Sequence, residues 1–388
     1  MRVNVASLTG THLLDLAREL DRAAVLETYY TGLPWFRMRG RGLPRARVRS
    51  CSWVLLPQIV GRLAGLPRLE SRALWATSES FDHWLARVEG PCDVLHVAAG
   101  CGLRAIRRAR QNGALTICDR GSAHIAVQDA LLRDEAARCG VVCERPDPRV
   151  IAKEEAEYEE ADLIVVPSTF ARLSYLQEGV APDKVVTIPY GVRLEQFSST
   201  GKRDDVFRVL CVAAVSLRKG IRYLLEAMSH LNLPNSELVL RGSVLPESRQ
   251  ILAQYAGRFR LHPPMSRYTH ELRDLYSQAS VLVLPSIEDG FGMVMTEAMA
   301  CGVPVIATTN TGAADLITEG TNGFIVPIRD ATAISERLEY LYRHPDERAA
   351  MGRAALDTAR SLNGWGRYVD QVLCTYRTRL SPADRKRP

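Results

Sequence analysis

The sequence predicts an α/β protein built from two doubly wound, parallel-sheet domains of the Rossmann-like type that face each other across a cleft. Three observations lead to this prediction. The chain has 388 residues, which is enough for two or three domains of ordinary size. Its composition, 46% hydrophobic and 24% charged, is typical of a well-packed globular protein. Short apolar runs alternate with longer amphipathic stretches along the whole chain, as in successive βαβ units.

The first half of the chain contains six apolar runs of strand length with helix-like segments between them. The predicted strands cover residues 3–6, 24–30, 93–98, 114–118, 162–167 and 184–189. The predicted helices include residues 13–20, 103–111 and 125–138. This series forms the first expected domain, residues 1–190.

The pattern then restarts after a short polar segment, residues 191–206, which we interpret as a linker. Further strands are predicted at residues 208–213, 237–241, 259–262, 280–285, 304–308 and 323–327. Helices are expected at residues 221–231, 270–278 and 331–343. The second domain is therefore placed at 207–360. Residues 361–388 are expected to form a helix that returns toward the first domain, followed by a loose tail.

The distribution of apolar residues and cysteines indicates a cytoplasmic chain. No apolar run approaches the roughly 18–20 residues that a spanning helix needs. The N-terminal segment MRVNVASLTG has no continuous apolar region of the kind found in secretory signals, and it reads as a first buried strand. Nine scattered cysteines without a Cys-x-x-Cys pair favour buried thiols over disulfides or a zinc site.

The positive charge is concentrated in the first 150 residues, which carry 22 arginines and no lysine against 15 acidic residues. Six of these arginines lie within residues 37–49, just after Trp35 and Phe36. Two interpretations of this segment stay open. It could be a solvated loop, or it could bind an anionic membrane surface at the inner face of the cell membrane. No nucleic acid partner is expected.

The segment from residue 285 to residue 307 is the most informative part of the sequence. A buried strand ends at Pro285, and a helix is expected to begin near Gly292. Gly290 and Gly292 allow backbone amides to approach an anion at the positive end of that helix. Asp289 and Glu297 flank this loop, and carboxylates accept hydrogen bonds from sugar hydroxyls. The pattern suits a phosphorylated sugar, although an ordinary strand–loop–helix turn with a surface aspartate would look similar.

A second basic motif, Arg218-Lys219-Gly220, follows a predicted strand and precedes a helix. Two cations at a helix start can hold a diphosphate, and the alternative is a solvated basic turn. The sequence has no Asp-x-Asp motif before a polar turn. We therefore expect no essential metal ion and no cofactor.

Together these motifs resemble the retaining family-4 glycosyltransferases of GT-B fold. The resemblance rests on a Glu-x7-Glu-like pattern around Gly-Phe-Gly, followed by Ala-Met-Ala-x-Gly-x-Pro-Val-Ile. Further matching segments are residues 162–168, 186–192, 218–220, 311–313 and 319–327. The similarity is close over about residues 150–360 and loose in the N-terminal part.

The resemblance implies roles for individual residues on the donor side. Asp289 stands where the family has its first Glu, close to the reacting carbon of the sugar, and the preceding Glu288 is a competing candidate. Glu297 matches the second Glu, which holds the ribose of the nucleotide. The remaining donor-binding residues implied by the resemblance are Gly290, Phe291, Gly292, Thr311 and Gly312.

The resemblance makes residues 1–190 the acceptor-binding domain, where the arginine-rich segment could present a lipid-linked or phosphorylated acceptor, and residues 207–360 the nucleotide-sugar-binding domain. It also implies catalytic and acceptor-side residues. Lys219 matches a phosphate-binding Lys, whereas the family's Arg has no counterpart at Ala213-Ala214, so we expect Arg218 to take its place. His124 matches a His near the transferred sugar. Gly10 and Thr11 resemble the family's glycine loop beside the acceptor.

The resulting prediction is a retaining, metal-independent hexosyltransferase. It would move a sugar from a nucleotide-diphosphate sugar to an acceptor hydroxyl, in keeping with assembly of a bacterial polysaccharide or glycolipid. Two alternatives stay open: a nucleotide-sugar epimerase on the same fold, and a non-enzymatic anion- or nucleotide-binding protein. A nicotinamide oxidoreductase is disfavoured because no Gly-x-Gly-x-x-Gly follows the first strand.

Overall fold

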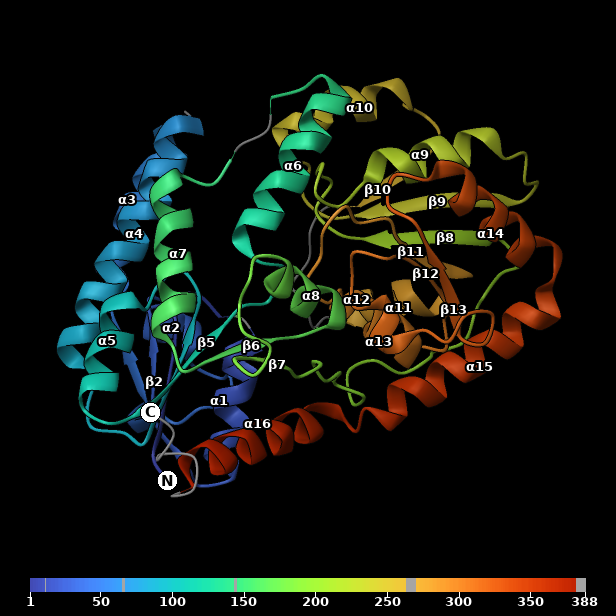
Figure 1. Cartoon of the computed structure of the whole chain (residues 1–388). Helices are drawn as coiled ribbons and strands as arrows, with labels where there is room; N and C mark the ends of the chain where they lie inside the picture. The colour runs from blue at the N-terminus through green and yellow to red at the C-terminus, as the bar shows by residue number, and fades with distance from the viewer. Residues whose placement is uncertain (11, 65–66, 143–144, 263–269, 382–388) are drawn as a thin grey trace.

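A computed structural model describes residues 1–10, 12–64, 67–142, 145–262 and 270–381 (Figure 1). The strands form two separate sheets, one of seven strands in the order β3-β2-β1-β4-β5-β6-β7 and one of six in the order β10-β9-β8-β11-β12-β13. Neighbouring strands are parallel throughout both sheets. The predicted fold class, two doubly wound α/β domains, is therefore confirmed.

The first sheet and its helices are formed by the N-terminal half of the chain. Its strands are β1 (Val3–Ser7), β2 (Leu26–Thr31), β3 (Val48–Ser50), β4 (Val94–Ala98), β5 (Leu115–Asp119), β6 (Leu163–Val166) and β7 (Val185–Thr187). Its helices are α1 (His12–Arg22), α2 (Trp35–Met38), η1 (Arg45–Arg47), η2 (Ser52–Leu55), α3 (Leu56–Ala64), α4 (Pro67–Val88), α5 (Leu103–Gln111), α6 (Ile125–Cys139), α7 (Pro148–Glu160) and α8 (Thr169–Gln177). The central strands β1, β4 and β6 are mainly apolar and almost entirely buried, as expected for a parallel sheet covered on both faces.

The second sheet restarts the same alternation. Its strands are β8 (Phe207–Val212), β9 (Ser236–Arg241), β10 (Arg260–His262), β11 (Val281–Leu284), β12 (Val305–Thr308) and β13 (Gly323–Val326). Its helices are α9 (Ile221–His230), η3 (Pro246–Ser248), α10 (Arg249–Gln254), α11 (His270–Ser277), α12 (Met293–Ala300), α13 (Ala313–Leu316), α14 (Ala331–Arg343) and α15 (Pro345–Ser361). A last helix, α16 (Gly364–Leu380), leaves this domain and packs against α1 and β5 of the first (Figure 1).

All twelve predicted strands are present, with ends that differ by at most two residues. The sequence analysis missed β3, which lies inside the arginine-rich segment 37–49. That segment is therefore not one loop: it contains α2, η1 and an edge strand that carries Arg49. Only Val48 of β3 is buried, so the strand has no apolar pattern that could have revealed it.

The two domains are in close contact at the carboxyl ends of their strands. A Cβ atom on Gly290 would lie 2.1 Å from the carbonyl oxygen of Gly121, so only a glycine allows this approach. Ser168 Oγ donates a hydrogen bond to the Gly290 carbonyl at 2.5 Å, and the Thr169 amide donates to Asp315 at 2.9 Å. The structure thus shows a closed arrangement of the two domains.

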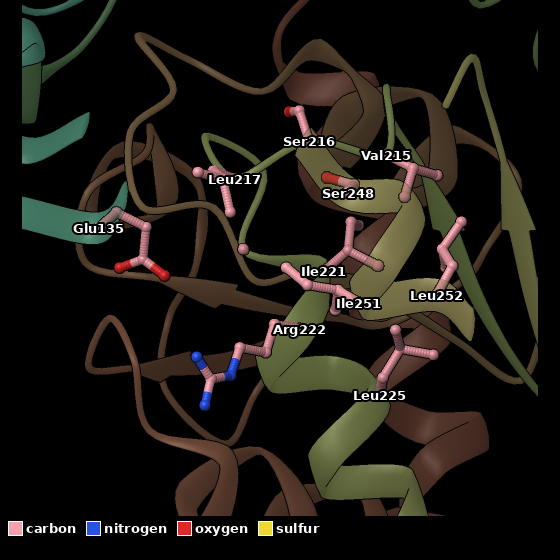
Figure 2. Close-up of a pocket in the computed structure, with 11 residues that line it drawn as sticks. Glu135, Val215, Ser216, Leu217, Ile221, Arg222, Leu225, Ser248, Ile251 and Leu252 are labelled. Atoms are coloured by element: carbon pink, nitrogen blue, oxygen red, sulfur yellow. The ribbon is translucent and has the colours of Figure 1, made fainter. Parts of the chain in front are cut away.

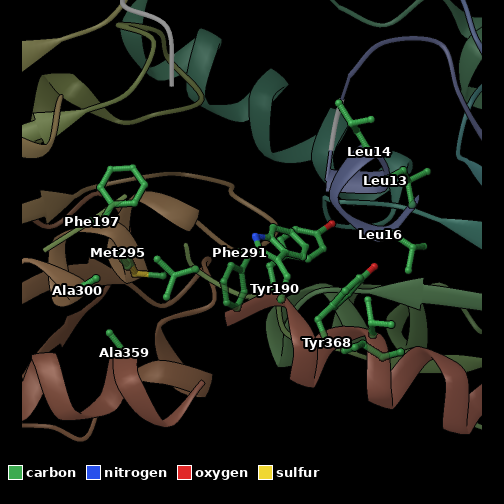
Figure 3. Close-up of a cluster of buried hydrophobic side chains, with 14 of the residues drawn as sticks. Leu13, Leu14, Leu16, Tyr190, Phe197, Phe291, Met295, Ala300, Ala359 and Tyr368 are labelled. Atoms are coloured by element: carbon green, nitrogen blue, oxygen red, sulfur yellow. The ribbon is translucent and has the colours of Figure 1, made fainter. Parts of the chain in front are cut away.

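One hydrophobic cluster continues from the first domain into the second (Figure 3). It runs from the α1 leucines through Tyr190 and Tyr368 to Phe291 and Met295 at the start of α12. Tyr190 and Phe291 meet edge to face, with ring centroids 5.4 Å apart. Within the described parts of the chain, no helix combines the length and apolar character needed to cross a bilayer.

Candidate active site

A cavity of about 290 Å³ lies between the two domains, at the carboxyl ends of both sheets. The first domain contributes Gly121, after β5, and Tyr190, after β7. The second domain contributes residues from the ends of β8 and β11 and from the loops that follow them: Val212, Ala213, Lys219, Leu284, Asp289, Phe291, Gly292, Met293 and Val294. Ligands of doubly wound folds bind at this position because the strand-to-helix loops converge there.

Lys219 and Asp289 form an ion pair on the wall of this cavity. Their loops are held together by Gly220, whose φ of 59° opens α9, because a Cβ there would lie 2.0 Å from the Pro285 carbonyl oxygen. Burial alone would raise the pKa of Asp289, but Lys219 and Arg218 lower it by more, so that the pKa falls below its usual range. The site therefore presents a charged carboxylate beside an ammonium group.

The first turn of α12 forms the neighbouring part of the wall. Gly292 precedes the helix with φ 80°, and a Cβ there would lie 2.4 Å from Leu284 Cδ2, so a glycine is required. Met293 and Val294 both line the cavity. The first N–H groups of a helix have no partner within it, and they carry the positive end of the helix dipole. This end of the cavity is suited to an anion such as a phosphate.

Glu288 has a different role from its neighbour Asp289. Its side chain is fully buried and accepts hydrogen bonds from the Ala123 amide at 3.0 Å, Gln128 Nε2 at 2.6 Å and Arg218 Nε at 2.6 Å. Ala123 and Gln128 belong to the first domain, so Glu288 connects the two domains. Of the two adjacent carboxylates left open by the sequence, Asp289 is the one that lines the cavity.

Arg218 is placed differently from the prediction. It was expected to join Lys219 in a diphosphate clamp, but its guanidinium binds Glu288 and, at 3.0 Å, Ser122 Oγ of the first domain. It does not line the cavity in this closed arrangement. The reason is the buried carboxylate of Glu288, which offers Arg218 a partner across the interface.

His124 also lies away from the cavity lining. It caps α6, accepting a hydrogen bond from the Ala126 amide at 3.3 Å, and its ring packs on Tyr158 and Tyr175 at 5.0 Å. Burial, with a smaller contribution from Arg120, lowers its pKa to about 4. The structure therefore places His124 as a neutral, buried helix cap, and the expected position beside the transferred sugar has no support in this geometry.

The other predicted donor residues lie behind the cavity wall. Glu297 is buried and accepts a hydrogen bond from Tyr276 Oη at 2.7 Å. The Gly312 amide donates a hydrogen bond to the Phe291 carbonyl at 3.0 Å. In the same turn, Thr311 Oγ1 accepts a hydrogen bond from the Ala313 amide at 3.1 Å. These residues support Phe291, which does line the cavity.

On the acceptor side, the structure describes only part of the predicted loop. Gly10 is exposed after β1, and Arg41 Nη1 lies 3.0 Å from the position that a Gly10 Cβ would take. Thr11 lies outside the described residues. The sequence analysis did not single out Tyr190 or Gly121, although Tyr190 belongs to a Pro-Tyr-Gly motif directly after a predicted strand.

A second, much smaller hollow lies between α9 and α10 (Figure 2). Its volume is about 10 Å³, and apolar side chains such as Ile221, Leu225 and Ile251 line it, with Glu135 and Arg222 at one side. A cavity of this size holds no more than a single water. Substrate binding is therefore assigned to the larger cavity.

Comparison with known proteins identifies the family. The family described as "Glycosyl transferases group 1" matches residues 192–358. A D-inositol 3-phosphate glycosyltransferase of Catenulispora acidiphila is 30% identical over 362 residues, which cover 86% of this chain and 83% of the relative. The chain belongs to the group 1 glycosyltransferases. The putative glycosyltransferase EpsD of Bacillus subtilis is 33% identical to this glycosyltransferase over 41% of the chain and 42% of EpsD.

Solved structures agree with the fold. A sucrose-phosphate synthase from Thermosynechococcus elongatus superimposes with a TM-score of 0.74 at 22% identity, covering 97% of this chain and 98% of the other. HepE of Anabaena, in complex with UDP-glucose, gives a TM-score of 0.67 at 16% identity, covering 97% and 100%. At these identities the likeness shows the GT-B fold of this glycosyltransferase and no more.

Proposed function

We propose that this glycosyltransferase moves a hexosyl group from a nucleotide-diphosphate sugar to an acceptor hydroxyl, with retention of the anomeric configuration. The observation that supports the proposal is the joint placement of Lys219, Asp289 and the first turn of α12 around one interdomain cavity. A cation and helix amides suit the diphosphate, and a carboxylate suits the sugar hydroxyls. HepE has been solved with UDP-glucose, which makes UDP-sugars the first donors to test.

The proposed reaction breaks the bond between C1 of the sugar and the β-phosphate oxygen, and forms a bond from C1 to the acceptor oxygen. The departing oxygen gains negative charge, which Lys219 and the α12 amides would stabilise. Asp289 would accept hydrogen bonds from the sugar and favour the positive charge that develops on its ring. The acceptor enters on the same face, and its hydroxyl proton ends on the departing phosphate oxygen.

We further propose that no divalent ion is needed, because Lys219 and the helix terminus already supply positive charge at the diphosphate. Activity should then survive an excess of EDTA. Loss of the rate on chelation, restored by Mg²⁺ or Mn²⁺, would contradict this part of the proposal.

The test of the function is the release of nucleoside diphosphate from a panel of nucleotide sugars, with and without candidate sugar, cyclitol and polyol-phosphate acceptors. We expect acceptor-dependent release in the wild type and in Arg353→Ala, which changes an exposed cation on α15, and little release in Lys219→Ala. NMR of the product should show the anomeric configuration of the donor. An isomerised donor without acceptor would indicate the epimerase, and binding without release would indicate a non-enzymatic protein.

A separate surface of the first domain supports the membrane interpretation of the arginine-rich segment. Trp53, Leu56, Ile59 and Val60 are 57%, 56%, 51% and 63% exposed, and their spacing puts them on one side of η2 and α3. Phe36, which directly precedes Arg37, is 75% exposed. Exposed large apolar side chains in one stripe mark an interaction site.

The six arginines divide into two groups. Arg45, Arg47 and Arg49 donate to backbone carbonyls of the first domain at 2.8, 3.3 and 3.2 Å, and so have structural partners. Arg37, Arg39 and Arg41 form the second group, and all three are exposed, the first two on either side of the buried Met38. Val54 Cγ2 of η2 lies 3.2 Å from the position that a Gly32 Cβ would take, so η2 packs against the chain shortly before this segment.

We therefore propose that the stripe and Arg37/Arg39 dock on an anionic bilayer. Liposome co-sedimentation tests this at low and high salt. Binding to anionic vesicles should fall with salt and be lost in Ile59→Ser/Val60→Ser and in Arg37→Ser/Arg39→Ser, but not in Leu173→Ser, a matched exposed leucine on α8. Equal sedimentation of all variants would contradict membrane docking.

A further inference from the structure

A chain of buried polar groups ends at the cavity wall of the first domain, and the proposed donor binding does not use it. His12, the first residue of α1, binds Asp119 at the end of β5, with 2.6 Å between Nε2 and Oδ1. The other oxygen of Asp119 binds His96 Nε2 at 2.9 Å, and His96 Nδ1 lies 2.7 Å from Tyr376 Oη of α16. Three separate segments of the chain thus converge on one carboxylate.

The carboxylate of Asp119 determines which nitrogen of His12 carries the proton. Burial would raise the pKa of Asp119, but His12 and His96 lower it by more, and the group is charged. A carboxylate only accepts hydrogen bonds, so Nε2 of His12 carries the hydrogen that it donates. In the neutral ring Nδ1 is then a hydrogen-bond acceptor. Among the described residues, the hydrogen-bond partners of the His12 ring, Asp119 and, at 3.2 Å, Tyr190 Oη, both lie at Nε2.

Gly121 leaves that edge of His12 open toward the cavity. His12 stacks on Tyr190, with ring centroids 4.4 Å apart, and both Tyr190 and Gly121 line the cavity. A Cβ on Gly121 would lie 3.0 Å from Tyr190 Oη, 3.6 Å from His12 Cε1 and 3.9 Å from Nδ1. A glycine at this position places no side chain of its own between the Cε1–Nδ1 edge and the cavity. The His12 side chain retains 10% exposure.

We propose that His12 Nδ1 accepts a hydrogen bond from a hydroxyl of the acceptor next to the one that reacts, and that Asp119 positions His12 for this contact. The proposal rests on the function proposed above. His12 belongs to the domain opposite Lys219 and Asp289, so it faces a bound donor from the acceptor side. It takes up no proton, because the proton of the reacting hydroxyl leaves with the phosphate. The acceptor class that fits is a sugar or cyclitol with neighbouring hydroxyls.

Three substitutions separate this role from a structural one. Asn places an amide oxygen close to the position of Nδ1, whereas Gln places its amide close to Nε2 and can replace only the bond to Asp119. We expect His12→Ala and His12→Gln to raise the acceptor KM about tenfold or more, and His12→Asn to stay within about threefold of the wild type. The control His83→Ala, an exposed histidine of α4, should be unchanged.

A deoxy acceptor provides the second arm of the test. Removing the hydroxyl that His12 binds should raise the KM of the wild type as much as His12→Ala does, with no further loss when the two changes are combined. Donor affinity, measured by calorimetry with the nucleoside diphosphate, verifies that each variant is folded. If His12→Gln and His12→Asn have equal acceptor KM values, or the two losses add, the inference is wrong. If no donor is turned over by the wild type, the proposed function itself fails.

Discussion

Lys219 is the side chain on which the proposed chemistry depends most. It is the cation of the cavity wall, and its neighbour Arg218 is engaged by Glu288. Replacing Lys219 by Ala should lower kcat by about 10²–10³, the usual loss when one preorganised charge-stabilising group is removed. Steady-state kinetics on folded protein measure this. A kcat for Lys219→Ala within about threefold of the wild type would exclude a role in stabilising the leaving group.

His124 gives a prediction about stability and pH. Its pKa is about 4 in the folded protein against 6.5 for an unperturbed imidazole, so the unfolded chain binds the proton first as the pH falls. Stability is therefore lost as the pH drops from about 6.5 to 4, by about 2 kcal/mol after solvent screening is taken into account. The free energies of unfolding of the wild type and His124→Gln, measured by denaturant titration, should converge as the pH falls through this range. Parallel curves would show that His124 is not a buried neutral cap.

Local sequence patterns indicate which side some residues of the candidate site face but not which side others face, for a physical reason. Lys219 and Asp289 adjoin a glycine turn after a buried strand, a local pattern that predicts an anion site. Whether Arg218 and Glu288 face that site depends on the partner that each finds in the other domain, which no local pattern contains. The same holds for His124, because its burial comes from Tyr158 and Tyr175 on other helices, and its role beside the transferred sugar stays a prediction.

At the scale of single elements, the strand pattern was informative because parallel strands buried on both faces are continuous apolar runs. All strands of this kind were predicted. The edge strand β3 and the helix pair α3–α4 were not, since β3 buries one residue and α3 exposes apolar side chains that its sequence alone would assign to a core. Local sequence patterns therefore predict elements at the edge of a sheet less well than its central strands.

The start of α12 depends on one glycine. Gly292 combines a φ of 80° with a Cβ position 2.4 Å from Leu284 Cδ2, so Gly292→Ala should destabilise the fold by about 1–3 kcal/mol and weaken binding of the nucleoside diphosphate. Thermal unfolding and calorimetry measure the two effects. Gly366→Ala, at a position with open space around it, is the control. Unchanged diphosphate affinity in Gly292→Ala would show that this helix terminus does not hold the ligand.

At the scale of the whole molecule, Glu288 links the domains by accepting bonds from Ala123, Gln128 and Arg218. Glu288→Gln removes the buried charge that forms the ion pair with Arg218 across the interface, so it should cost about 2–4 kcal/mol and increase the radius of gyration of the free protein. Chemical denaturation and small-angle X-ray scattering test this, with the exposed Glu155→Gln as the control. An unchanged radius and stability would mean that other contacts keep the domains closed.

The central claim is that the interdomain cavity binds a nucleotide-diphosphate sugar through Lys219, Asp289 and the first turn of α12. A crystal structure with the donor selected by the nucleotide-sugar panel tests it most directly. The account predicts the diphosphate within hydrogen-bond distance of Lys219 Nζ and the α12 amides, and a sugar hydroxyl on Asp289. A donor bound outside this cavity, or a diphosphate held by a divalent ion with Lys219 turned away, would contradict it.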